Sequence, residues 1–287
     1  MNKPDKTVKT EKTAALYVVA TPIGNLGDLS ARALKTLEDV DFIAAEDTRR
    51  AAALLNAFGI KKPVIGYYKD KEKSRAEVVL QRLKNGESAA LISDAGTPAI
   101  SDPGAVLVAR ARDEGIAVYT VPGACAAVAA FSICGLPSGY VFFGFLRGRA
   151  KDRRAALEPF KGLALPLIFY SAPHDVNDDL QFLYSELGDR SVYAAREMTK
   201  IYEEFIVGTL GGLRFENPRG EFVLIVGGLP KDVAYGGANA DVGGVLRRLL
   251  DGGTPSKEAI KAAAKAAGLP KDAAYKEYLK IKEDLPL

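Results

Sequence analysis

The sequence predicts an α/β protein, because short apolar runs of strand length alternate with segments of helical periodicity along most of the chain. Several of these runs are apolar throughout, which is typical of strands whose two faces are both covered by helices. Glycine and proline mark the junctions between the two kinds of segment. The expected strands are residues 16–20, 42–45, 64–67, 89–93, 117–121, 140–145, 167–170, 191–195 and 222–226.

Composition places the chain among ordinary globular proteins and indicates about two domains, with 287 residues, 48% hydrophobic and 26% charged. The two cysteines, Cys125 and Cys134, match no zinc or redox spacing, so we expect a reduced, cytoplasmic protein. The first apolar run is too short for a signal peptide, and no segment has the roughly 18 apolar residues of a membrane helix. We therefore expect a soluble protein without membrane association. The net charge of +3 does not indicate any partner.

Three helix starts can be read from capping residues. Ser74 and Glu77 form a capping-box pattern, and Asp102 with Pro103 resembles an N-cap followed by a first-turn proline. Gly115 is expected to end the second of these helices. Pro173 is expected to open a third helix, closed by Gly188, with apolar residues at helical spacing: Val176, Leu180, Leu183 and Leu187.

The same signals divide the chain into five parts. Residues 1–13 form a basic leader that we expect to be disordered, and residues 14–122 form a first α/β domain that ends near Pro122 and Gly123. Residues 123–230 form a second α/β domain, and residues 231–241 a glycine-containing linker. The pattern of residues 242–287 is helical, with Ser256 as a cap and a last helix over 271–281, and predicts a helix-turn-helix-like extension.

Three turns that follow expected strands are candidates for ligand contact. They are residues 21–26 (Thr-Pro-Ile-Gly-Asn-Leu), 93–98 (Ser-Asp-Ala-Gly-Thr-Pro) and 122–126 (Pro-Gly-Ala-Cys-Ala). Ligands of open α/β sheets bind outside the carboxyl ends of the strands, and small residues there let a ligand approach the backbone. Asp94 can accept a hydrogen bond from a ribose hydroxyl. Alternatively, these segments are well-formed turns with an Asx motif at Asp94.

A fourth turn, residues 46–50 (Glu-Asp-Thr-Arg-Arg), carries charge at the end of the second expected strand. Asp47 can cap the following helix, and two adjacent carboxylates beside arginine can have shifted pKa values. The alternative is a solvated helix start with a salt bridge. Dinucleotide-binding and P-loop glycine motifs are absent, as is metal-ligand spacing, and His174 is the only histidine. A basic stretch of five side chains lies within eight residues: Arg147, Arg149, Lys151, Arg153 and Arg154.

Taken in order, these motifs resemble those of the ribosomal RNA small-subunit methyltransferase I family. The resemblance runs from about Ala15 to Gly228 and includes the turns at 21–26, 45–49 and 93–98. Further matches are residues 102–104 (Asp-Pro-Gly), 144–146 (Gly-Phe-Leu), 167–170 (Leu-Ile-Phe-Tyr), 196–200 (Arg-Glu-Met-Thr-Lys) and 220–223 (Gly-Glu-Phe-Val).

The resemblance implies a tetrapyrrole-methylase-like fold, in which a cleft between two α/β domains holds S-adenosylmethionine. It also implies a homodimer that methylates the ribose 2′-oxygen of a cytidine in the decoding region of 16S ribosomal RNA, free or in the assembled small subunit, without a metal. The residues expected to bind the methyl donor are Pro22, Gly24, Asp94, Ala95, Gly96, Thr97, Pro98, Gly123, Ala124, Cys125, Ala126 and Tyr170.

For catalysis, Glu46 is the first candidate base and Asp47 the second, because both follow a strand, while Arg49 can hold a phosphate. The basic stretch of residues 147–154 is expected to contact RNA phosphates rather than only to form a solvated helix face. The extension could bind RNA as well, or could simply be a soluble helical hairpin.

Two other functions fit parts of the sequence. Where the family commonly has Glu-Ser-Pro-His-Arg, this chain has Ser171, Ala172, Pro173, His174 and Asp175. The change would suit an RNA-binding relative with weakened catalysis. A methyltransferase acting on a small tetrapyrrole is the other alternative. Such enzymes typically carry a G-x-G-P-G-D pattern after the first strand, and residues 21–26 do not match it.

Overall fold

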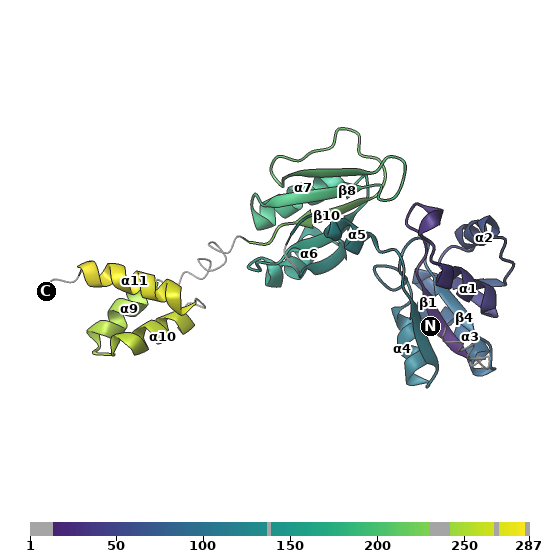
Figure 1. Ribbon diagram of the computed structural model, residues 1–287, viewed down its shortest axis with the longest axis horizontal. Coiled ribbons are helices and arrows are strands. Elements are labelled where there is room, and N and C mark those ends of the chain that lie inside the picture. The colour runs from purple at the N-terminus through teal and green to yellow at the C-terminus, as the bar shows by residue number, and fades with distance from the viewer. Residues whose placement is uncertain (1–13, 137–138, 230–241, 267–269, 285–287) are drawn as a thin grey trace, which may run out of the picture.

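The computed structural model describes residues 14–136, 139–229, 242–266 and 270–284. Two five-stranded sheets follow each other along the chain, and three helices come after them (Figure 1). The leader expected at residues 1–13 and the linker expected at 231–241 lie outside the described residues.

The first sheet is parallel and has the strand order β3-β2-β4-β1-β5. Parallel pairing brings the carboxyl ends of all five strands to one edge, where the turns that follow them meet. The strands are β1 (Ala15–Val19), β2 (Phe42–Ala45), β3 (Val64–Gly66), β4 (Ala89–Ile92) and β5 (Ala117–Val121).

Helices cover both faces of this sheet. On one face, α1 (Ala31–Asp39) and α2 (Thr48–Ala57) pack their buried leucines against β2 and β4. On the other, α3 (Glu72–Lys84) and α4 (Ala105–Asp113) form a second apolar layer. The central strands β2 and β4 are fully buried, which explains their continuously apolar sequences.

The second sheet is mixed and has the strand order β6-β7-β10-β8-β9. Only β6 and β7 pair in parallel; the other neighbours are antiparallel. The strands are β6 (Val141–Phe145), β7 (Leu167–Ser171), β8 (Ser191–Arg196), β9 (Glu204–Thr209) and β10 (Phe222–Val226). The sequence did not predict β9, because this edge strand has only one face packed and exposes Val207.

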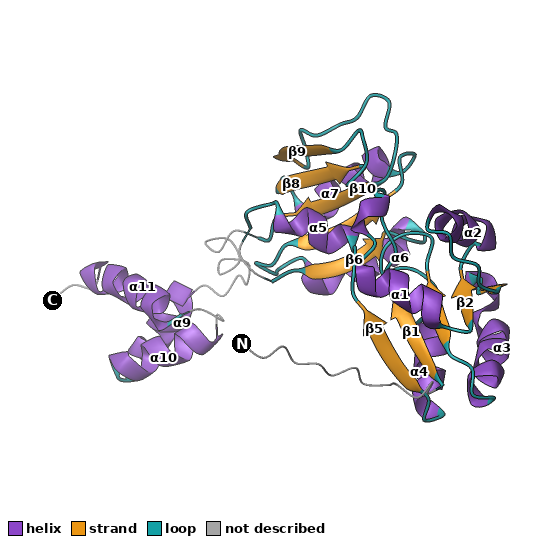
Figure 2. Cartoon of the chain, turned by 45° about the vertical axis from the view of Figure 1, so that its right-hand side comes forward, coloured by secondary structure: helices purple, strands orange, loops and turns teal. Residues whose placement is uncertain are grey.

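Helices also lie on both faces of the second sheet (Figure 2). The short helix α5 (Ala126–Ser132) packs its alanines against β7 and β10. On the opposite face, α6 (Ala150–Leu157) and α7 (Val176–Leu187) bury leucines against the same strands. The apolar face and the end predicted for α7 are confirmed, since all four expected apolar residues are buried and Gly188 ends the helix with a φ of 77°. The predicted start at Pro173 is wrong, because the helix begins at Val176 after Asp175.

The other two predicted helix starts are also wrong. Helix α3 begins at Glu72, and Ser74 lies inside it with its hydroxyl bonded to the Lys71 carbonyl rather than acting as a cap. Helix α4 begins at Ala105, after Gly104. The Gly104 amide is bonded to Glu72 Oε1 at 2.8 Å, so the loop is fixed by α3 and Asp102 is not the cap.

The last three helices form a small bundle with its own apolar core. They are α9 (Val242–Asp251), α10 (Ser256–Ala266) and α11 (Lys271–Asp284). Leu246, Ala263 and Ile281 meet at the centre of the bundle, and the Tyr278 hydroxyl lies 3.0 Å from Ser256 Oγ. None of the helices in the described residues is both long and apolar enough to cross a membrane.

Candidate active site

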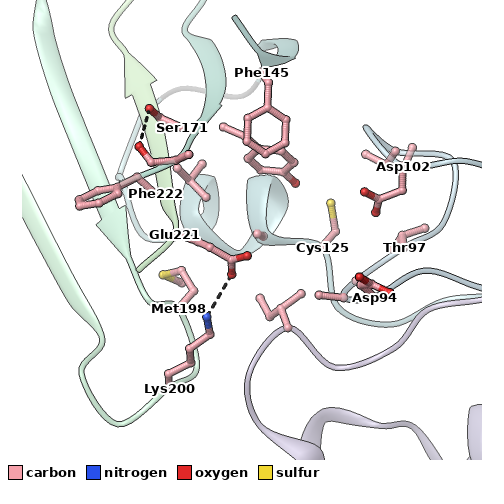
Figure 3. Close-up of a pocket in the computed structure, with 18 of the residues that line it drawn as sticks. Asp94, Thr97, Asp102, Cys125, Phe145, Ser171, Met198, Lys200, Glu221 and Phe222 are labelled. Atoms are coloured by element: carbon pink, nitrogen blue, oxygen red, sulfur yellow. Dashed lines mark hydrogen bonds and ion pairs between the residues drawn. The ribbon is translucent and has the colours of Figure 1, made fainter. Parts of the chain in front are cut away.

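A cleft of about 390 Å³ lies between the two sheets and is lined by residues from both. In Figure 3, Asp94, Thr97 and Asp102 face Ser171, Met198 and Glu221 across it. Of the residues expected to bind the methyl donor, seven line the cleft: Asp94, Ala95, Gly96, Thr97, Cys125, Ala126 and Tyr170.

The turn after β4 is fixed by hydrogen bonds to its neighbours. Thr21 and Gly96 exchange two backbone hydrogen bonds of 2.9 and 3.0 Å, and the Thr97 hydroxyl donates to the Ala124 carbonyl at 3.0 Å. Gly96 has a φ of 77°, in the left-handed region that glycine adopts readily, and a Cβ there would lie 3.2 Å from Ile23. The backbone of this turn is therefore held against the cleft without bulky side chains.

Asp94, in the same turn, is oriented by the start of α2. Its Oδ1 accepts a 3.1 Å hydrogen bond from the Asp47 amide, and its Oδ2 lies 3.5 Å from Arg50 Nη1. Its side chain remains 27% exposed. The carboxylate is thus held in place by the second strand-end turn while it faces the cleft.

Three carboxylates line the cleft on the side of the first sheet: Glu46, Asp94 and Asp102. Burial raises the pKa of Glu46 above its ordinary value, and the charges of Asp102 and Asp94 raise it further. Burial also raises the pKa of Asp102, against a hydrogen bond with Ser93 that lowers it. This wall favours a cationic ligand, and Glu46 and Asp102 are the two carboxylates in it whose raised pKa values suit them to accept a proton.

Asp47 and Arg49, the other two catalytic candidates, do not line the cleft. Asp47 caps α2 by accepting the Arg49 amide at 2.8 Å, and its carboxylate pairs with the Arg49 guanidinium at 2.9 Å. These bonds to Arg49 lower the pKa of Asp47 to about 2. The Arg49 side chain is 90% exposed, so it could meet a ligand only outside the cleft.

Tyr170 closes the cleft from β7. Its hydroxyl accepts the amide hydrogen of Ala127 at 3.2 Å, and its ring makes edge contacts with Phe142 and Phe145. Burial raises the pKa of Tyr170 well above its usual range, so the hydroxyl stays protonated. It can donate a hydrogen bond into the cleft or supply an apolar ring face.

The remaining residues expected at the donor site shape turns and domain contacts instead of lining the cleft: Pro22, Gly24, Pro98, Gly123 and Ala124. A Cβ on Gly24 would lie 2.5 Å from Lys200 Cγ, so this glycine lets the turn after β1 touch the loop after β8. A Cβ on Gly123 would lie 2.9 Å from the Ala20 Cβ.

Sequence reasoning did not assign Asp102, Met198, Lys200 or Glu221 to the site, although all four line the cleft. Lys200 bridges Glu221 at 3.0 Å and Glu197 at 2.8 Å. The signal for Met198 and Lys200 was the family-like motif at residues 196–200, which was read only as a resemblance.

Most of the basic stretch on and before α6 already has partners. Arg153 pairs with buried Asp179 at 3.2 Å, Arg154 with Glu186 at 2.8 Å and Arg149 with Asp152 at 3.4 Å. Arg147 lies over the Phe145 ring at 5.5 Å, and Lys151 is exposed. Asp179 also accepts the Ser171 hydroxyl at 2.6 Å, which connects Arg153 to the wall of the cleft.

Within the described residues, no group of three or more His, Cys, Asp or Glu side chains is arranged to hold a metal ion.

Comparison with known proteins identifies the fold. Residues 15–214 match the family model of the tetrapyrrole (corrin/porphyrin) methylases. Diphthine synthase superposes with a TM-score of 0.62 at 14% identity, covering 75% of this chain and 89% of that one. A uroporphyrin-III C-methyltransferase from Thermus thermophilus, solved with S-adenosyl homocysteine, superposes with a TM-score of 0.55 at 17% identity, covering 74% and 97%.

The sequence relatives are more similar and cover nearly the whole chain. The ribosomal RNA small subunit methyltransferase I of Haemophilus influenzae is 42% identical over 93% of this chain and 96% of its own length. The protein of the same name from Xylella fastidiosa is 45% identical over 91% and 97%. The chain therefore belongs to the tetrapyrrole methylases and, among them, to the ribosomal RNA small subunit methyltransferase I family.

Proposed function

We propose that this protein transfers a methyl group from S-adenosylmethionine to the 2′-oxygen of a cytidine ribose in the decoding region of 16S ribosomal RNA. The relatives that cover almost the whole chain are named for ribosomal RNA methylation. The observation that carries the reaction is the position of Glu46, a partly buried carboxylate with a raised pKa at the end of β2, facing the cleft.

The residues of the cleft fit the methyl donor. When bound, S-adenosylmethionine would supply an electrophilic methyl carbon on a sulfonium cation, and its carbon–sulfur bond would break to leave a neutral thioether. The three carboxylates of the cleft wall suit that positive charge, and a volume of about 390 Å³ is in the usual range for small-molecule sites. The turn at Gly96 carries only small side chains, so the donor can approach its backbone closely, and Asp94 can accept from a ribose hydroxyl.

The protein's main contribution is orientation. Holding the attacking oxygen in line with the methyl carbon can supply about 7–11 kcal/mol of the barrier. Glu46 takes the proton from the ribose hydroxyl as the bond to carbon forms, a step that contributes about two to four orders of magnitude in rate. Burial and the charges of Asp102 and Asp94 raise the pKa of Glu46, which makes this carboxylate a better proton acceptor than an exposed one.

For the RNA, Lys151 and Arg147 are exposed members of the basic stretch, and Arg147 lies over the Phe145 ring while its charge acts on Asp102. Arg149 and Arg154 are also exposed and could exchange their carboxylates for phosphates, whereas Arg153 is held by buried Asp179. Arg49 could add a phosphate contact outside the cleft. We also propose that the protein acts as a homodimer and that its C-terminal bundle contributes to RNA binding. The substrate in this proposal is the small ribosomal subunit.

The test is transfer of labelled methyl groups. Purified protein is incubated with labelled S-adenosylmethionine and, in parallel, with unmodified small ribosomal subunits, free 16S RNA or a uroporphyrinogen. Label in a 2′-O-methylated cytidine of the RNA supports the proposal. Label in the tetrapyrrole, or at a base or another ribose, contradicts it. Binding of the donor without transfer would indicate the catalytically weakened relative.

A further inference from the structure

The loop between β8 and β9 presents two apolar side chains to solvent at its tip. Ile201 is 94% exposed and Tyr202 is 76% exposed. They are the two most exposed of the large hydrophobic side chains in the described part of the chain. Single exposed apolar residues are ordinary on protein surfaces. Two adjacent large apolar side chains that are both mostly exposed indicate a surface that binds a partner.

The tip is held in a defined conformation. Glu197 and Thr199 have φ values of 51° and 66°, in the left-handed region that costs energy for residues other than glycine. The Lys200 amide donates to the Glu197 carbonyl at 3.0 Å, and the Thr199 amide donates to Glu203 Oε2 at 2.6 Å. The exposure of Tyr202 is therefore built into the turn that precedes it.

The tip begins at the rim of the cleft. Met198 and Lys200 line the cleft, and Ile201 is the next residue along the chain (Figure 3). Lys200 is fixed there by its ion pairs with Glu197 and Glu221 and by the close approach of Gly24.

The carboxylates near the tip are already engaged. Glu203 accepts the Thr199 amide, and Glu204 pairs with Arg196 at 2.7 Å. Glu197 and Glu221 share Lys200. In these contacts two cations, Arg196 and Lys200, face four carboxylates, so the surroundings of the tip keep a net negative charge. An apolar, partly aromatic tip in such surroundings suits the face of a nucleobase better than a phosphate.

We propose that Tyr202 stacks on an RNA base next to the methylated nucleotide and that Ile201 fills the space beside it. This inference rests on the proposed function. A ribose can reach the end of the cleft only if its nucleotide leaves the regular stack, which costs stacking energy with its neighbours. An aromatic ring at the rim replaces that lost stacking and holds the displaced strand. Tyr202 thus acts as a binding and positioning residue outside the reacting centre.

The kinetic test compares Tyr202→Ala, Tyr202→Phe and Ile201→Ser with the unaltered protein on unmodified small ribosomal subunits. Loss of one base–aromatic stack is expected to raise KM for the subunit by roughly 5- to 150-fold in Tyr202→Ala, with donor affinity unchanged. Tyr202→Phe should retain the original KM, because stacking needs the ring and not the hydroxyl. Tyr184→Ala, which truncates an exposed tyrosine of α7, is the matched control.

A spectroscopic test uses the absence of tryptophan from the chain. When Tyr202→Trp is expressed with 7-azatryptophan in place of tryptophan, the protein carries one fluorescent label at residue 202. The emission wavelength of this label differs from that of the tryptophans in ribosomal proteins. Stacking on a base should change this emission when small subunits are added, and Tyr184→Trp should show no comparable change.

The outcomes separate this inference from the function on which it rests. If the unaltered protein does not methylate the RNA, the proposed function fails and this inference fails with it. If it methylates the RNA and Tyr202→Ala keeps the original KM and kcat, only the role of the tip is refuted. A dimer that dissociates on Tyr202→Ala, seen by light scattering, would identify the tip as a subunit contact and also refute the stacking role.

Discussion

The amide of Asp47 donates a 3.1 Å hydrogen bond to Asp94 Oδ1, which joins the turn after β2 to the turn after β4. Arg50 strengthens this connection through its 3.5 Å approach to Asp94 Oδ2. Glu46 precedes Asp47 and faces the cleft. The hydrogen bond between Asp47 and Asp94 therefore holds both the candidate base and the turn expected to bind the methyl donor. A change at Asp94 should therefore affect both donor binding and the rate of transfer.

We expect Asp94→Ala to weaken donor binding by about 1.5–3 kcal/mol, the usual contribution of a hydrogen bond to a charged group. Asp94→Asn should have an intermediate affinity for the donor. The side-chain oxygen of asparagine can still accept the hydrogen bond from the backbone amide of Asp47, but it carries no charge. Calorimetric titration with S-adenosylmethionine measures both variants. Equal affinity for Asp94→Asn and the unaltered protein would mean that the charge contributes nothing.

Glu46→Gln should lower kcat by about two to four orders of magnitude while donor and RNA affinities change little. The carboxylate accepts a proton only when ionised, so the rate should fall as the pH drops through the raised pKa of Glu46. Single-turnover rates across the acidic pH range measure this profile. Full activity of Glu46→Gln would remove Glu46 as the base.

Asp102→Asn gives an independent test of the same assignment. The Asp102 charge is, after burial, the largest cause that raises the pKa of Glu46. Removing it should lower the Glu46 pKa, so the inflection of the rate profile should move to lower pH. An inflection that stays in place would mean that a group other than Glu46 controls the rate.

Much of the fold could be predicted because the first sheet is parallel and covered on both faces. Its central strands are apolar throughout, and the residues that follow them in the sequence include Glu46 and Asp94, which line the cleft. The rule that ligands bind at the carboxyl ends of parallel strands does not extend to the mostly antiparallel second sheet. Met198, Lys200 and Glu221 reach the cleft from loops of that sheet, so the strand-end rule did not assign them to it, although the motifs at 196–200 and 220–223 contain them.

The basic residues 147–154 are clustered in the sequence, but the charge that two of their arginines leave free depends on carboxylates of α7. Asp179 and Glu186 lie 26 and 32 residues away from the arginines that they pair with, and nothing near residues 147–154 indicates them. The unpredicted strand β9 has a similar cause, because an edge strand with an exposed face lacks the continuous apolar run of a buried one.

Gly24→Ala tests the contact between the two sheets. The new Cβ would lie 2.5 Å from Lys200 Cγ and 3.1 Å from the Met198 carbonyl oxygen, so the loop after β8 must shift. Overpacking of this kind costs about 1–3 kcal/mol, and we expect both lower stability and lower donor affinity. Gly162→Ala is the control, since a Cβ there meets nothing within 4 Å. Denaturant unfolding and donor titration should distinguish the two variants.

Arg153 and Lys151 are two residues apart on α6 and should behave differently. Arg153→Ala leaves the carboxylate of Asp179, only 5% exposed, without its cation, and should destabilise the fold by up to about 3 kcal/mol. Lys151→Ala removes an exposed cation and should leave stability unchanged while reducing the salt dependence of RNA binding by about one unit of slope. Unfolding curves and RNA titrations at several salt concentrations measure these effects. The reverse pattern would refute this division of roles.

Glu186 should make part of the stability depend on pH. Hydrogen bonds from Arg154 and Lys161 lower its pKa in the folded protein to about 2, below the value of about 4.3 expected in an unfolded chain. A lowered pKa stabilises the fold above the unfolded value, and this contribution is lost as the pH falls toward the folded value. Glu186→Gln should therefore be less stable than the unaltered protein at pH 7, with a difference that narrows between about pH 4.3 and pH 2. Denaturant unfolding at a series of pH values measures it. A difference that stays constant over this range would show that Glu186 acts through packing rather than through its charge.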